Sequence, residues 1–257
     1  MIALSVTVNK SALLRNSRGG ARPDLLELAR MALLAGAHGI TVHPRPDQRH
    51  IRASDVPALA AMLRAEFPDA EFNIEGNPFA PANAGGYPGL EALVAEARPA
   101  QVTLVPDSDA QLTSDHGWDL PAEADRVRPL IQRMQAQGAR VSLFMDPDPT
   151  AIAAVPDTGA ERIELYTGPF AQAYAEDGHA GGPQSRASLE AFTRAAERAR
   201  DLGLGINAGH DLDLANLVAL RTLPGLAEVS IGHALVADAL ELGWFGTVRR
   251  YLQVLNG

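Results

Sequence analysis

The fold of this chain is decided by GITVHPRPDQRHIRASDVPALAAMLRAEFPDAEFNIE, residues 39–75. This stretch begins with the apolar run GITVH (39–43), passes through ASDVPALAAMLRAEF (53–67) and ends with EFNIE (71–75). Short runs rich in Val, Ile and Phe predict strands, whereas apolar residues at helical spacing predict a helix. The stretch therefore predicts a strand, a helix and a second strand, the arrangement from which parallel sheets are built.

The same alternation extends along the whole chain. Amphipathic stretches such as 24–37, 124–138 and 186–203 separate the segments that have the composition of strands. Eight such units of roughly 30 residues fit a closed parallel barrel better than an open sheet. We therefore expect an α/β fold, a single (β/α)8 TIM barrel with extra helical decoration, as one domain over residues 1–257. The other six expected strands are IALSVTV (2–8), QVTLVP (101–106), RVSLFMD (140–146), RIELY (162–166), LGINAG (204–209) and EVSIG (228–232).

Three connections are unusually long and rich in Gly and Pro: residues 76–89, 107–123 and 167–186. Each follows an expected strand, so all three would lie at the C-terminal end of the barrel. The opposite connections look short. Long loops at this end predict lids or clamps over a substrate.

Composition excludes several classes of protein. The chain has 22 Lys and Arg against 31 Asp and Glu, a formal net charge of −9, which disfavours a nucleic-acid binder. It has no Cys, which excludes disulfides, thiol nucleophiles and thiolate metal sites. The N-terminus lacks the pattern of a signal peptide, and no apolar run is long enough to cross a membrane. We expect a cytoplasmic protein that does not bind membranes.

Polar side chains gather where the expected strands end. In a barrel these positions converge on one cavity, where catalytic residues usually lie. Burial at the end of FNIE would raise the pKa of Glu75 towards that of a useful base, although a salt bridge is the alternative. Glu164 lies inside its strand and is either a catalytic group or an internal charge partner. The set is Asn9, Lys10, His43, Arg45, Glu75, Thr113, Asp146, Glu164, His210, Gly232 and His233.

Two kinds of cation suggest phosphate chemistry. Lys10 is the single lysine beside 21 arginines, and we expect it in the loop after the first strand. It is either a chance choice on a solvated loop or an amine that the site requires. Arg18, in LLRNSRGG (13–20), is either a bidentate phosphate ligand or a surface residue. We find no metal-binding motif and no Gly-rich nucleotide fingerprint.

The chain resembles the pyridoxine 5′-phosphate synthase family over essentially its whole length. GITVHPRPDQRHI (39–51) is the most specific segment, and NAGHDL (207–212) and SIGHALV (230–236) support it. The resemblance implies a (β/α)8 barrel that assembles into homo-octamers. It also implies a ring-closing transferase of vitamin B6 biosynthesis that needs no metal or organic cofactor.

The reaction that the resemblance implies joins two phosphorylated small molecules. It condenses 1-deoxy-D-xylulose 5-phosphate with 3-amino-2-oxopropyl phosphate, and releases phosphate and water. Matched by motif, His43 and Glu75 correspond to proton acceptors, His210 to the proton donor and Glu164 to a group that stabilises charged intermediates. Residues 107–120 correspond to a segment that closes over the substrates. The matched binding positions are Arg18, Arg45, His50, Thr113, Gly232 and His233.

Four positions depart from the family pattern. After the first strand the family has V-N-x-D-H, whereas this chain has Thr7, Asn9 and Lys10; after His210 it has Asp211 in place of Gly. We expect all four residues to contact substrate, in a divergent branch with the same reaction. Two alternatives remain open. One is a Schiff-base aldolase with Lys10 as nucleophile; the other is a non-catalytic barrel that binds phosphorylated sugars.

Overall fold

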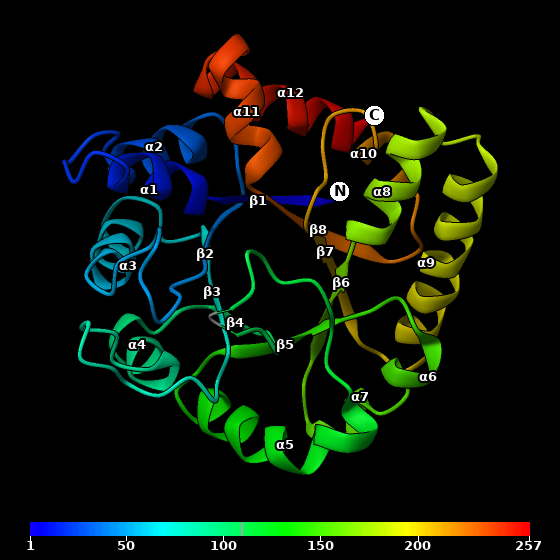
Figure 1. Cartoon of the computed structure of the whole chain (residues 1–257), viewed down its shortest axis with the longest axis horizontal. Helices are drawn as coiled ribbons and strands as arrows, with labels where there is room; N and C mark the ends of the chain where they lie inside the picture. Colours follow the sequence, from blue (N-terminus) through cyan, green and yellow to red (C-terminus); the bar gives the residue numbers. More distant parts are fainter. Residues whose placement is uncertain (109) are drawn as a thin grey trace.

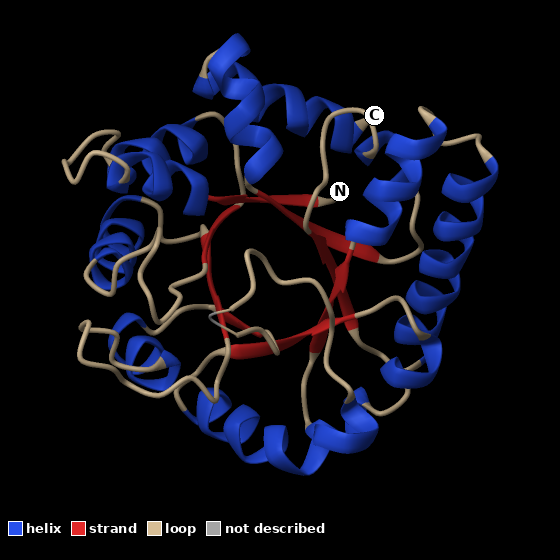
Figure 2. Cartoon of the chain, viewed as in Figure 1, coloured by secondary structure: helices blue, strands red, loops and turns tan. Residues whose placement is uncertain are grey.

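The computed structural model describes residues 1–108 and 110–257. Its centre is one closed barrel of parallel strands that follow one another around the ring in chain order, with the last strand paired to the first (Figures 1 and 2). The predicted (β/α)8 barrel is confirmed. The strands are β1 (Ala3–Thr7), β2 (Gly39–Val42), β3 (Glu71–Gly76), β4 (Gln101–Leu104), β5 (Arg140–Met145), β6 (Arg162–Tyr166), β7 (Gly205–Gly209) and β8 (Leu226–Ile231).

Helices surround the barrel in the described part of the chain. Several connections hold two helices, which is the expected extra decoration (Figure 2). The helices are α1 (Asn9–Asn16), α2 (Leu25–Leu34), α3 (Asp55–Glu66), α4 (Leu90–Ala97), α5 (Leu120–Ala136), α6 (Pro149–Ile152), α7 (Val155–Thr158), α8 (Gly168–Asp177), α9 (Pro183–Asp201), α10 (Leu217–Leu220), α11 (His233–Leu242) and α12 (Trp244–Asn256).

The two faces of the barrel wall differ in chemistry. Alternate residues such as Val6 and Ile40 are fully buried and belong to the apolar core. The other face points into the barrel and carries small polar side chains. Ser5 and Thr41 hydroxyls lie 2.7 Å apart, and the Thr103 hydroxyl donates to Asn73 Oδ1 over 3.1 Å. Because side chains alternate along a strand, this same inward face places Glu75 and Glu164 at the cavity described below.

The N-terminal end of the barrel holds a layer of charged residues. Arg140 Nη2 lies 2.7 Å from Glu71 Oε2, and Arg162 Nη1 lies 3.9 Å from Glu228 Oε2. Burial, followed by the nearby Glu71 carboxylate, raises the pKa of Glu228 to about 8. This carboxyl is therefore protonated in the folded protein at neutral pH.

Two segments that we expected to be loops contain helix, so these two predictions are wrong in part. Lys10 lies in the first turn of α1, not in a loop, and Arg15 of that helix forms a double ion pair with Asp55. Sequence spacing gives no sign of such a distant partner. Residues 167–186 hold α8 and the start of α9, each of which has Pro in its first turn. Proline ends helices but also begins them, since the first turn needs no N–H donor there.

The described residues between β4 and α5, 105–108 and 110–119, form no helix or strand, whereas the last four residues of the expected connection 107–123 belong to α5. The loop between β4 and α5 crosses the open C-terminal end of the barrel (Figure 1). The Trp118 Nε1–H donates to the Leu104 carbonyl over 2.8 Å, which ties the end of the loop to the strand from which it started. We refer to residues 107–118, except Asp109, as the β4–α5 loop.

Candidate active site

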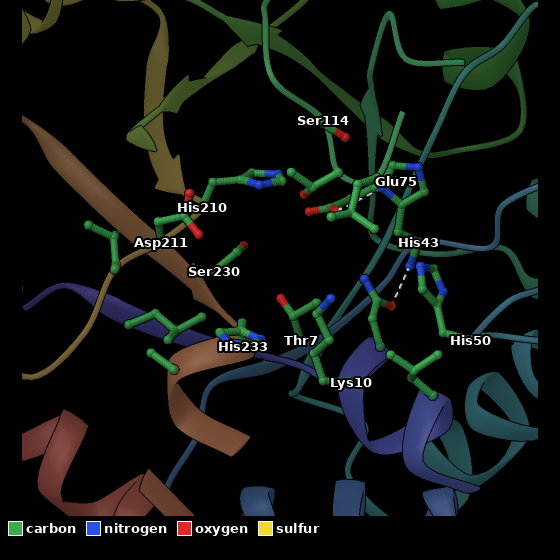
Figure 3. Close-up of a pocket in the computed structure, with 18 of the residues that line it drawn as sticks. Thr7, Lys10, His43, His50, Glu75, Ser114, His210, Asp211, Ser230 and His233 are labelled. Atoms are coloured by element: carbon green, nitrogen blue, oxygen red, sulfur yellow. Dashed lines mark hydrogen bonds and ion pairs between the residues drawn. The ribbon is translucent and has the colours of Figure 1, made fainter. Parts of the chain in front are cut away.

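A cavity of about 370 Å³ opens at the C-terminal end of the barrel, beneath the β4–α5 loop. Figure 3 shows His210, Asp211 and Ser230 on one side of the opening and Glu75 and His43 on the other. Thirteen of the fifteen residues that the sequence suggested for the site line this cavity. They are Thr7, Asn9, Lys10, His43, Arg45, His50, Glu75, Thr113, Glu164, His210, Asp211, Gly232 and His233.

Arg18 is one of two suggested residues that the structure does not bring into the cavity. It is exposed in the turn after α1 and is absent from the cavity lining. Asp146, which ends the expected fifth strand, is also absent from the lining. Position beside a strand end is therefore not sufficient, because Asp146 directly follows β5 and still lies outside the lining. Arg18 follows a complete helix instead of a strand.

Asn9 and Lys10 occupy the first turn of α1, directly beyond β1. The Asn9 side chain accepts a hydrogen bond from the His43 backbone N–H over 2.9 Å, which joins the end of β2 to α1. The Lys10 side chain points into the opening (Figure 3). No hydrogen bond or ion pair of its ammonium occurs among the described residues. Lys10 is therefore available to a bound anion or carbonyl group.

His43 lies between two buried carboxylates. Its Nδ1 is 3.5 Å from Glu75 Oε2 and its Nε2 is 3.2 Å from Asp107 Oδ2. Burial alone would lower the pKa of this imidazole, but the charge and hydrogen bond of Asp107, with those of Glu75, outweigh burial and raise it. The pair of carboxylates makes His43 a stronger base than a solvated histidine.

Asp107 was not predicted from the sequence. Its carboxylate is buried and also lies 2.7 Å from Arg45 Nη2 and 3.2 Å from the Ser114 hydroxyl. Arg45 in turn donates to the Ser108 carbonyl. The signal was present, since Asp107 follows β4 by three residues, but a position that far beyond a strand does not reveal which way its side chain points.

Glu164 is buried inside the barrel beside Glu75. Burial, and then the neighbouring Glu75 and Glu228 carboxylates, raises its pKa well above the usual value for a carboxyl. Its Oε2 has no hydrogen-bond partner among the described residues. The raised pKa favours the neutral acid form of Glu164, in which the carboxyl can donate a proton or a hydrogen bond into the cavity.

His210 follows β7 and packs edge-on against two aromatic rings. Its ring centroid is 5.0 Å from that of Phe144 and 5.7 Å from that of Tyr166. Burial lowers the pKa of this imidazole, although the charges of Glu75 and Asp211 oppose the effect. His210 therefore favours the neutral form, whereas His43, whose pKa is raised, favours the protonated form. The two histidines of the site therefore differ in proton affinity.

The backbone at His210 and Asp211 is left-handed, with φ of +79° and +56°. Two consecutive non-glycine residues in this region are strained, at about 1–2 kcal/mol each. The Thr167 hydroxyl donates to the carbonyls of Gly209 and His210 and holds the turn in place. This conformation directs the His210 ring over the cavity and is consistent with Gly being the family residue at position 211.

His50 is buried and uncharged. Burial, followed by the charges of His43, Arg45 and Lys10, lowers its pKa to about 3. Its Nδ1 accepts a hydrogen bond from the Ile51 backbone N–H over 2.9 Å. The proton of the neutral ring therefore lies on Nε2, which makes His50 a fixed hydrogen-bond donor without a charge.

Ser114, Ser230 and Arg49 also line the cavity and were not predicted. No group of three or more His, Cys, Asp or Glu side chains with the geometry to hold a metal ion occurs in residues 1–108 and 110–257. No described helix has the length and apolar character to cross a membrane.

Known proteins of similar sequence identify the family of this chain. The model of the family described as "Pyridoxal phosphate biosynthesis protein PdxJ" matches residues 4–257. Pyridoxine 5′-phosphate synthase from Xanthomonas oryzae pv. oryzae (strain MAFF 311018) is 56% identical over 257 residues, which is 100% of this chain and 97% of that protein. Its counterpart from Xanthomonas campestris pv. campestris (strain B100) is 57% identical over 99% of this chain and 96% of that protein.

A more distant solved structure shares the fold alone. The chain from the crystal structure of the Amycolatopsis orientalis BexX/CysO complex superposes with a TM-score of 0.60 at 17% identity, over 100% of this chain and 90% of that one. Similarity at this level shows a common barrel and says nothing about the reaction.

Proposed function

The chain belongs to the PdxJ family of pyridoxal phosphate biosynthesis proteins and is an enzyme that makes pyridoxine 5′-phosphate, and we propose how its cavity does so. The condensation of 1-deoxy-D-xylulose 5-phosphate with 3-amino-2-oxopropyl phosphate requires an amine to add to a ketone. Water and phosphate then leave, and the ring closes. Every step moves protons at carbon or oxygen, so the site needs acids and bases of different strength.

Binding of two phosphorylated substrates needs local positive charge, because the whole chain carries a net charge of −9. Lys10, Arg45 and Arg49 line the cavity and supply that charge. Gly232 and His233 begin α11, whose first N–H groups support phosphate binding, as helix N-termini do. Thr7, Asn9, His50, Thr113 and Asp211 are the further proposed substrate contacts.

Arg18 remains a proposed phosphate ligand on sequence alone. Its exposed position outside the cavity gives that assignment no support.

Glu75 is the proposed base that removes a proton from carbon. It is buried and ends the inward face of β3, with His43 at 3.5 Å to receive the proton. The raised pKa of His43 favours this transfer. Together the two side chains are the proposed proton acceptors.

His210 and Glu164 are the proposed acid side of the site. Because burial lowers the pKa of His210, it enters the reaction neutral and first takes a proton from the adding amine or carbinol. It then returns that proton to the departing oxygen as the donor. The raised pKa of Glu164 favours its acid form, which would stabilise negative charge on the intermediates by donating a hydrogen bond.

The observation that carries this proposal is the contrast between the histidines across one cavity, His43 with a raised pKa and His210 with a lowered one. The test mixes purified protein with both substrates and follows phosphate release and the absorbance of the pyridine product. Omission of either substrate should abolish both signals. Absence of both signals with the complete mixture would leave the non-catalytic sugar-phosphate barrel as the better description.

The aldolase alternative keeps one supporting observation, the Lys10 ammonium that has no protein partner among the described residues. It predicts a covalent imine between Lys10 and a keto-phosphate, with no pyridine product.

We further propose that the protein is cytoplasmic, works as a homo-octamer on two phosphorylated small molecules, and does not bind nucleic acid. Sedimentation or mass photometry of the purified protein tests the octamer. We also propose that residues 1–257 form a single catalytic domain.

A further inference from the structure

We propose that Asp107, at the start of the β4–α5 loop, is a positioning residue of this enzyme. It sets the orientation and basicity of His43 and so links both properties to the position of that loop. This inference rests on the proposed function of His43 as a proton acceptor. It assigns a role to a residue outside the set matched by motif, and it stands on contacts that converge on one carboxylate oxygen.

Three donors surround Asp107 Oδ2. His43 Nε2 lies at 3.2 Å, Arg45 Nη2 at 2.7 Å and the Ser114 hydroxyl at 3.2 Å. His43, Arg45 and Asp107 are each at most 5% exposed, so water screens these interactions poorly. Asp107 is thus the counter-ion for two cavity residues at once.

The backbone of Asp107 is also fixed. Its carbonyl accepts a hydrogen bond from Asn77 Nδ2 over 2.5 Å, which anchors the residue to the end of β3. The side chain then meets Ser114 from the far part of the same loop, while Arg45 donates to the Ser108 carbonyl. The contacts of Asp107 and Arg45 thus help to hold the loop over the cavity. Loop position and His43 ionisation are therefore coupled.

The His43 ring has a carboxylate at each of its two nitrogens. Glu75 contacts Nδ1, on the side of the cavity, and Asp107 contacts Nε2, on the side of the loop. A carboxylate on Nε2 fixes the plane of the imidazole and stabilises its charged form, so Nδ1 can accept a proton through Glu75. The charged and titratable groups around His43 are Glu75 from β3, Asp107 from the β4–α5 loop, Arg45 and His50 after β2, Lys10 from α1 and His210 after β7.

The direction of the pH effect follows from these charges. A proton acceptor must be unprotonated, so activity falls as the pH drops through the pKa of His43. Asp107 raises that pKa. Replacing Asp107 by Asn removes the charge and keeps the size, and should therefore move the acidic limb of the kcat/KM profile to lower pH by about one unit. At the optimum, kcat should fall at least about tenfold, because a weaker base transfers protons more slowly.

Asp115→Asn is the matched control. Asp115 belongs to the same loop and also contacts a histidine, His116, at 2.7 Å, but its side chain is 56% exposed. This variant should leave the acidic limb and kcat unchanged. Asp107→Glu is the conservative variant, which should keep the limb close to that of wild type because the charge remains.

Direct titration of His43 by NMR separates positioning from mere structural support. The imidazole pKa should be lower in Asp107→Asn than in wild type and unchanged in Asp115→Asn. An Asp107→Asn enzyme that loses activity with an unmoved limb and an unmoved His43 pKa would overturn the inference. Should Asp107→Asn fail to fold, Asp107→Ser, which also removes the charge, takes its place, and an unmoved His43 pKa in that variant would overturn the inference too. Inactivity of the wild type would refute the proposed function, whereas the NMR titration would still decide the role of Asp107.

Discussion

The carboxylate of Glu164 occupies the space that a side chain at Gly209 would need. A Cβ at position 209 would collide with Glu164 Oε1, across the β6–β7 pairing. The glycine that precedes His210 therefore makes room for an acid of the site, in addition to allowing the turn.

Gly209→Ala should consequently displace Glu164 and lower turnover. Overpacking a buried position costs about 1–3 kcal/mol, so the melting temperature should also fall. Gly246→Ala is the control, because nothing lies within 4 Å of a Cβ there and the position is helical. That change should be neutral or stabilising. Full activity and stability in Gly209→Ala would contradict this prediction, because it would show that Glu164 can shift without loss of function.

Glu75→Gln should reduce kcat by about 10²–10⁴-fold, because Gln cannot remove a proton from carbon. Affinity for each phosphorylated substrate, measured by calorimetry, should stay close to that of wild type. Glu91→Gln, at an exposed carboxylate paired with Arg133, is the control and should change neither quantity. A Glu75→Gln enzyme with normal kcat would remove this carboxylate from the mechanism.

Lys10 distinguishes the synthase from the aldolase. Treatment with borohydride and 1-deoxy-D-xylulose 5-phosphate should leave the protein mass unchanged if Lys10 serves only as a cation. Lys10→Arg should then keep most of the turnover, since the positive charge remains. A stable adduct on Lys10, lost in Lys10→Arg together with turnover, would support covalent catalysis instead.

Folding stability should decline between pH 4.5 and pH 8 because of Glu228. The folded-state pKa of about 8 is above the ordinary value of 4.5, so in this window the unfolded chain loses a proton that the folded protein keeps. The decline should amount to at most about 5 kcal/mol and level off above pH 8. Denaturant unfolding at several pH values measures it.

Glu228→Gln should flatten that dependence, whereas Glu241→Gln, at an exposed position, should not. An unchanged slope in Glu228→Gln would mean that another buried group, such as Glu164, causes the decline.

The barrel and most of the cavity could be predicted from sequence because both follow from strand periodicity. Once GITVH and EFNIE are parallel strands, His43 and Glu75 must meet at one end. Positions set by distant contacts could not be predicted. The inward turn of Asp107 depends on Arg45, and the helical state of Lys10 depends on a helix held by the Arg15–Asp55 pair.

The helices inside residues 167–186 were missed for a different reason. Glycine and proline mark loops in most contexts, yet Pro169 and Pro183 lie where helices begin. Composition alone cannot separate these two uses of proline.

The lone lysine gives this barrel a built-in reporter of occupancy. Lys10 and the amino terminus are the chain's two primary amines, and only Lys10 faces the cavity. An acylating reagent should therefore modify Lys10 more slowly when a ligand fills the barrel mouth, while modification of the amino terminus provides an internal standard. Mass spectrometry of intact protein could then rank inhibitors without any turnover assay.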